Sequence, residues 1–162
     1  MEINIPPNLN HEEIKCFNEI VKPQLEELYS YNYNNFEFKH IKISISKDKF
    51  PDNIKKPNIE EIKNILNKIS KNDLKFISEI YFVSYPCKDD NHKEFKGRTL
   101  PIIYKIIIYP KAYEKLKIIL VHEIGHIIFE NELSNKLKLL FASEIIKTFF
   151  QIIPWSMEER DK

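Results

Sequence analysis

One segment in the last third of the chain is apolar on nearly every side and still carries three ionisable side chains. Residues 118–129 read IILVHEIGHIIF, a pattern that leaves no polar face wide enough for a helix lying on the surface. We therefore predict a buried helix that starts at Pro110, a residue typical of a first helical turn, and ends near Glu130. Two histidines and a glutamate inside such a helix need partners, because burying an unpartnered polar group is costly.

The spacing of these three residues predicts a metal site. His122 and His126 are four residues apart, about one helical turn, so both imidazoles lie on one face and can bind the same ion. Glu123 is rotated by about 100° from His122, which suits a base that contacts a metal-bound water. Zinc with an open position lowers the pKa of its water to about 7, and a carboxylate can pass that proton to a leaving amine. The alternative is a pair of core histidines bonded to backbone carbonyls, with Glu123 at a solvated edge.

The rest of the chain alternates between helical and extended patterns. Asn10 followed by Glu13 predicts a capped helix to about Tyr29, kinked by Pro23, and Asn58 is the expected N-cap of a second helix. Strands are expected at 36–45 with a bulge at His40, at 80–85 and at 102–109; an exposed loop is expected at 87–98, and an apolar helix at 135–153. This order favours an α+β fold in a single domain of residues 1–162, with a small mixed sheet and backing helices.

Composition excludes several functional classes. The 162 residues include 25 basic and 24 acidic side chains, so the formal charge of +1 gives no field for collecting nucleic acid. Apolar runs are too short to span a membrane, and the N-terminus lacks the pattern of a secretion signal, so we expect a cytoplasmic protein. Cys16 and Cys87 are too few for a disulfide framework.

His122-Glu123-Ile124-Gly125-His126, preceded by a strand and a short turn, resembles the active-site helix of the zincin metallopeptidases. The resemblance covers about residues 100–153, which would form the catalytic core of a minimal zincin. It implies zinc as the cofactor and Glu123 as the catalytic base. It also implies that the strand at 102–109 lies at the sheet edge and pairs with an extended peptide or protein substrate.

The third zinc ligand is less well specified. Phe129 and Glu132 stand where the metzincin branch has a glycine and a ligand, which disfavours that branch. Gluzincins take a glutamate from a following helix, and the resemblance to them makes Glu144 the expected third ligand. Glu158 and Glu159, after the stop at Pro154, are the alternatives.

Three functions are compatible with these features. The first is a zinc-dependent endopeptidase of gluzincin type. The second is a regulatory peptidase with the same chemistry, directed at a repressor or host protein, as in mobile elements. The third is a zincin scaffold that binds protein without cutting it. Residues 1–35 are a candidate N-terminal extension or pro-segment, and no pattern defines the oligomeric state.

Overall fold

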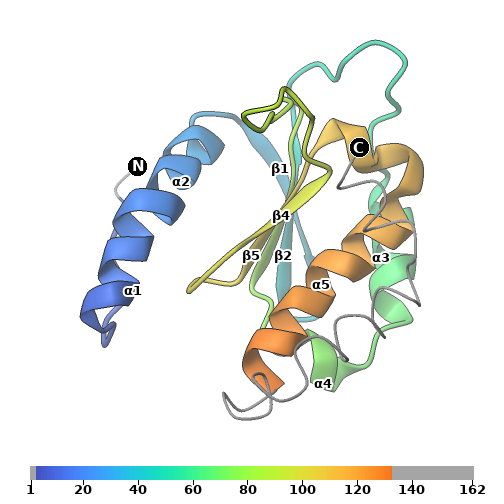
Figure 1. Cartoon of the computed structure of the whole chain (residues 1–162). Helices are drawn as coiled ribbons and strands as arrows, with labels where there is room; N and C mark the ends of the chain where they lie inside the picture. The colour runs from blue at the N-terminus through green and yellow to red at the C-terminus, as the bar shows by residue number, and fades with distance from the viewer. Residues whose placement is uncertain (1–2, 133–162) are drawn as a thin grey trace.

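A mixed sheet of five strands forms the centre of the fold in the computed structural model, which describes residues 3–132 (Figure 1). The strands are β1 (Tyr33–Phe38), β2 (Ile41–Ser46), β3 (Glu79–Phe82), β4 (Gly97–Leu100) and β5 (Lys105–Ile108). Their order is β1-β2-β3-β5-β4. The three central strands are parallel, and each outer strand runs antiparallel to its neighbour. The expected α+β class with a small mixed sheet is therefore confirmed.

Three of the described helices begin at a side chain that caps their first turn. The bounds are α1 (His11–Cys16), the π-helix η1 (Phe17–Val21), α2 (Lys22–Tyr29), α3 (Ile59–Asn67), α4 (Lys71–Leu74), the 3₁₀ helix η2 (Pro110–Lys115) and α5 (Leu116–Glu132). The amide of Glu13 donates to Oδ1 of Asn10 over 2.8 Å, and the Asn58 side chain caps α3. The expected distortion at Pro23 is a π-helical turn just before it, consistent with the missing proline N–H.

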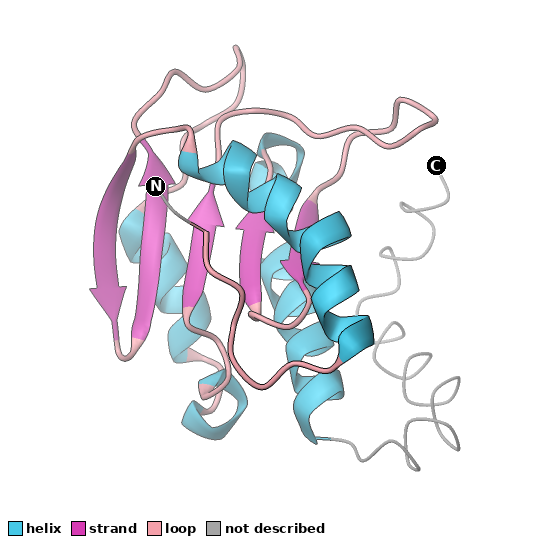
Figure 2. Ribbon diagram, turned by 90° about the vertical axis from the view of Figure 1, so that its left-hand side faces the viewer, coloured by secondary structure: helices cyan, strands magenta, loops and turns pink. Residues whose placement is uncertain are grey.

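The sheet is covered by helices on both faces. Ile80 and Phe82 belong to the core cluster shared with α3 and α5, whereas Tyr81 and Val83 belong to a second cluster with η1 and α2. This alternation follows from the two-residue period of a strand. Figure 2 shows α1 and α2 crossing one face, with α3 and α5 behind the strands. Within residues 3–132, no helix is long and apolar enough to cross a membrane.

The expected position of the edge strand is wrong. We placed the strand at 102–109 on the sheet edge, but β5 starts only at Lys105 and lies between β3 and β4. Ile106, Ile107 and Ile108 are all fully buried, as expected of a strand covered on both faces. The edge strand next to α5 is instead β4, which the sequence analysis had partly assigned to the polar loop at 87–98.

The bulge expected at His40 is also wrong. The chain reverses there through the turn Lys39-His40, which joins β1 to β2 in register from Tyr33 opposite Ser46 to Phe38 opposite Ile41. Lys39 has a φ of 57°, in the left-handed region that tight turns use. The phase slip in the apolar pattern therefore marks a change of strand.

Candidate metal centre

Helix α5 carries the motif against the sheet. It follows η2, in which Pro110 occupies the first turn as expected. Tyr113 fastens this junction because its hydroxyl donates to the main-chain oxygens of Val83, at 2.5 Å, and Ile108, at 3.1 Å. The side chains of Ile119, Leu120, Ile124 and Ile127 are buried in the core cluster beneath the sheet. The expected buried helix is confirmed, and its position fixes where the ionisable side chains lie.

The two histidines point at the same place. Nε2 of His126 lies 3.1 Å from Nε2 of His122, and the two rings are nearly perpendicular at 88°. Two nitrogens bound to one tetrahedral zinc at about 2.0–2.1 Å lie roughly 3.3 Å apart, close to the separation found here. His122 is 3% exposed and His126 is half-buried. The pair can therefore act as a chelate without a change of backbone.

Glu123 lies beside the histidine pair and is buried to the same degree as His122. In the described residues 3–132, one group of three side chains offers ligand atoms close enough for a metal: His122, Glu123 and His126, whose ligand atoms lie within 4.8 Å of one another. Imidazole nitrogens with a nearby carboxylate are a donor set that zinc accepts. The residues present therefore fit a divalent ion with open positions.

Two residues of β4 contact Glu123, and neither was predicted from the sequence. Thr99 Oγ1 lies 2.8 Å from Oε2 of Glu123 and 3.2 Å from its main-chain oxygen. A Cβ on Gly97 would lie 2.9 Å from the Cγ of Glu123, so only glycine allows this approach without a shift. The signal available in the sequence was the rarity of glycine, because a lone glycine in a strand often marks close backbone approach.

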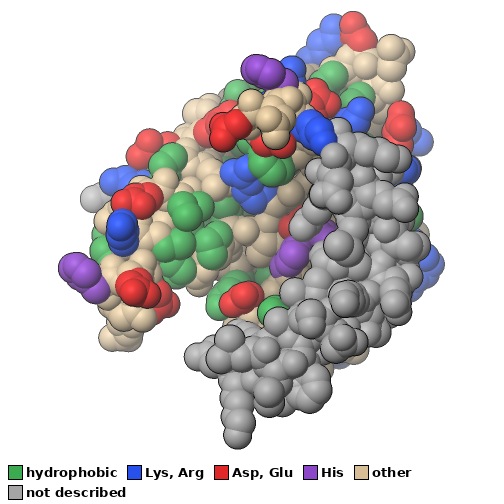
Figure 3. All heavy atoms as spheres, viewed as in Figure 1, with side chains coloured by type: hydrophobic (Ala, Val, Ile, Leu, Met, Phe, Trp, Pro, Cys, Tyr) green, Lys and Arg blue, Asp and Glu red, His purple; other side chains and the backbone are tan. Residues whose placement is uncertain are grey.

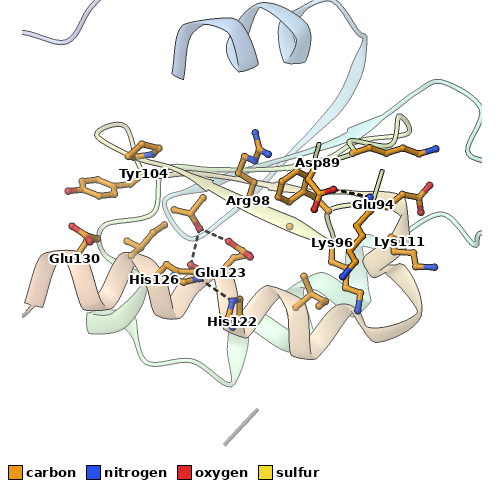
Figure 4. A pocket seen from close by; sticks show the side chains of 18 of the residues that line it. Asp89, Glu94, Lys96, Arg98, Tyr104, Lys111, His122, Glu123, His126 and Glu130 are labelled. Carbon is orange, nitrogen blue, oxygen red and sulfur yellow. Dashed lines mark hydrogen bonds between the residues drawn. The ribbon is translucent and has the colours of Figure 1, made fainter. Parts of the chain in front are cut away.

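The motif opens into a cleft of about 1220 Å³ (Figure 4). Its walls are α5, β4, the turn at 101–104 and the loop at 88–96. Tyr104 and Glu130 lie at one end, and Lys96 and Lys111 lie at the other with Glu94 and Asp89. In the space-filling view, histidine and acidic side chains lie in a hollow of this face (Figure 3). Within the described residues, His122, Glu123 and His126 therefore line this cleft, although two of them are buried.

Burial shifts the pKa of one ionisable group at each end of the cleft. Burial raises the pKa of Tyr104, and the neighbouring Glu130 carboxylate adds to the effect, so this phenol stays protonated near neutral pH. Burial lowers the pKa of Lys96, and the positive charges of Lys115 and Lys111 act in the same direction. Both groups are proton donors from which a substrate could accept a hydrogen bond.

The expected third ligands and two other histidines, His92 and His40, lie as follows. Glu144, Glu158 and Glu159 lie outside the described residues, and so does the helix expected at 135–153. His92 lines the cleft from an exposed loop. His40 is at the β1–β2 turn, where its Nε2 lies 2.9 Å from the main-chain oxygen of Leu74, and it does not line this cleft. Comparison with protein-family models, curated proteins and solved structures finds no significant match.

Proposed function

We propose that this chain is a zinc-dependent peptidase of zincin type, in which His122 and His126 hold the metal and Glu123 is the general base. The observation that carries the proposal is the convergence of two imidazole nitrogens, 3.1 Å apart, next to a buried carboxylate in an open cleft. The same separation also suits a hydrogen bond between two neutral imidazoles, so zinc content is the decisive measurement. Zinc bound there would act as a Lewis acid. It would lower the pKa of a bound water molecule and polarise the carbonyl of the substrate.

The protein's own residues supply positioning and proton transfer. The histidines bind as neutral imidazoles through Nε2, on the side that faces the cleft. A carboxylate oxygen of Glu123 accepts the proton of the attacking water and returns it to the departing amine nitrogen. Burial of Glu123 strengthens this transfer because few water molecules compete for its oxygens.

A peptide substrate would extend along β4. This strand pairs with β5 on one side, and no other strand of residues 3–132 pairs with its second side. Its main-chain groups are therefore placed to pair with an extended chain that enters the cleft. The scissile bond would then lie beside the free side of β4, in the cleft that the motif on α5 also lines. A third ligand from Glu144, or from Glu158 or Glu159, completes the proposal.

Metal content and proteolysis together test this function. Elemental analysis of the purified chain should give about one zinc per molecule, and His122→Ala should lose it. Glu123→Ala should keep the zinc and lose hydrolysis of labelled casein, by about 10²-fold or more. His11→Ala and Glu61→Ala are matched controls because both residues are exposed and do not line the cleft.

The outcomes separate the three candidate functions. Casein hydrolysis that depends on Glu123 supports the peptidase. Full zinc content without casein hydrolysis contradicts a general peptidase and favours a binding scaffold or a regulatory peptidase with one substrate. Zinc retained equally by wild type and His122→Ala contradicts the metal site itself. Glu144→Ala, Glu158→Ala and Glu159→Ala, compared for zinc retention, identify the remaining ligand.

A further inference from the structure

We infer that Thr99 is a positioning residue, which holds the carboxylate of Glu123 in the orientation that the reaction requires. The inference rests on the proposed function and extends it to the edge strand. Thr99 belongs to β4, whereas Glu123 belongs to α5, so the contact joins the strand that would pair with a substrate to the helix that carries the motif.

Thr99 contacts Glu123 at two points. Its Oγ1 lies 2.8 Å from the carboxylate oxygen Oε2 and 3.2 Å from the main-chain oxygen of the same residue. The hydroxyl has one hydrogen, which it donates to the nearer oxygen, Oε2, so the contact ties the Glu123 carboxylate to β4. A β-branched threonine suits this task because its χ1 angle is restricted. Three rotatable bonds separate the backbone of a glutamate from its carboxylate, and the contact with Thr99 restricts them.

Strand pairing and core packing hold the backbone of β4 in place, so that Thr99 can orient Glu123. Thr99 is paired with Ile106 of β5, and the next residue, Leu100, is fully buried in the core cluster on the opposite face. Gly97, two residues earlier and therefore on the same face as Thr99, lets the strand approach Glu123 closely. The position of the Glu123 carboxylate is therefore set by the sheet as well as by α5.

Thr99 has no contact with either histidine among the hydrogen bonds of the described residues, so its loss should spare metal binding. A carboxylate that has lost this contact would occupy the productive orientation for a smaller fraction of the time. Misplacement of a catalytic group by about 1 Å can cost a factor of 10² in rate. We expect loss of the hydroxyl to reduce kcat by about tenfold and to leave KM within about twofold.

Two substitutions separate positioning from packing. Thr99→Val keeps the shape of the side chain and removes the hydroxyl, whereas Thr99→Ser keeps the hydroxyl and removes a methyl group. With labelled casein as the probe, Thr99→Val should lower kcat about tenfold at unchanged zinc content. Thr99→Ser should stay within about threefold of wild type. The reverse order, or equal kcat for wild type and Thr99→Val, overturns the inference.

A second measurement needs no activity. Urea unfolding of the metal-free full chain is compared for wild type, Thr99→Val, Glu123→Ala and the double variant. Because a charged hydrogen bond links the two side chains, their effects should be non-additive by a factor of about ten in the unfolding equilibrium. Additive effects overturn the contact, and with it the inference. If the coupling is present but Glu123→Ala still cuts casein at the wild-type rate, the proposed function fails, and the catalytic role of Thr99 fails with it.

Discussion

Gly97→Ala tests how tightly β4 is packed against α5. The added Cβ would lie 2.9 Å from Cγ of Glu123, 3.2 Å from its Oε1 and 3.2 Å from Cγ2 of Ile119. Comfortable carbon–carbon contacts start at about 3.5 Å, so the methyl group would overlap Glu123 by roughly 0.6 Å. Overpacking of this kind typically costs about 1–3 kcal/mol. Part of that is offset, because alanine restricts the unfolded chain and stabilises by about 0.4–1 kcal/mol wherever it fits.

The sign of the change in the free energy of unfolding therefore tests whether β4 and α5 are in close contact. Gly97 does not have a positive φ, so alanine meets no backbone strain, and only the contact with α5 can make it unfavourable. We expect a net loss of about 1–2 kcal/mol in the free energy of unfolding, measured by urea titration of the full chain followed by circular dichroism. In a Glu123→Ala background the loss should shrink, because two of the three nearest atoms are gone. A Gly97→Ala variant as stable as wild type, or more stable, would refute the close approach.

Three other predictions each concern one side chain or one pair of side chains. Tyr113→Phe should lower the free energy of unfolding by about 1–2 kcal/mol, because two main-chain oxygens lose their phenol donor; an unchanged urea midpoint would contradict this. Burial of Glu79 opposes its ionisation, but hydrogen bonds from Lys105 and a tyrosine outweigh burial and lower its pKa below 4.5. Because that pKa is lower in the folded state, the stability it contributes is present above pH 4.5 and is lost as the pH falls through the folded pKa. The difference in unfolding free energy between wild type and Glu79→Gln should therefore be largest near pH 7 and shrink by pH 3. The affinity for zinc should fall steeply below about pH 6, because His122 and His126 bind only as neutral rings; an affinity that is equal at pH 7 and pH 4.5 would exclude them as ligands.

Local features of the sequence predicted where α1, α3 and η2 begin. The caps at Asn10 and Asn58 and the proline at the start of η2 act within one turn of the chain, so neighbouring residues suffice to define them. The same holds for the histidine pair, because four-residue spacing on a helix places both rings on one face wherever the helix lies. The pair's proximity was predictable, whereas its surroundings were not.

Strand order was the main error because it depends on pairings between distant segments. β5 follows β4 in the chain but pairs with β3 on its other side, so that β4 is left at the edge. A closer reading of composition could have shown this: three consecutive buried isoleucines suit an internal strand, whereas β4 carries Arg98 and Thr99 between Gly97 and Leu100. The partnership of Thr99 with Glu123, 24 residues away, has no local signature at all.

The candidate pro-segment at residues 1–35 includes side chains that pack against the sheet. Phe17, Val21, Leu25 and Leu28 are buried against the sheet face that also holds Leu100 of β4. Each large apolar side chain released to water would cost about 1.5–3 kcal/mol, so removing residues 1–35 would forfeit an amount comparable to the total stability of an ordinary domain. It would also remove the packing that holds β4, and with β4 the contact between Thr99 and Glu123. This geometry favours a permanent layer of the fold over a pro-segment that is cleaved off to release activity.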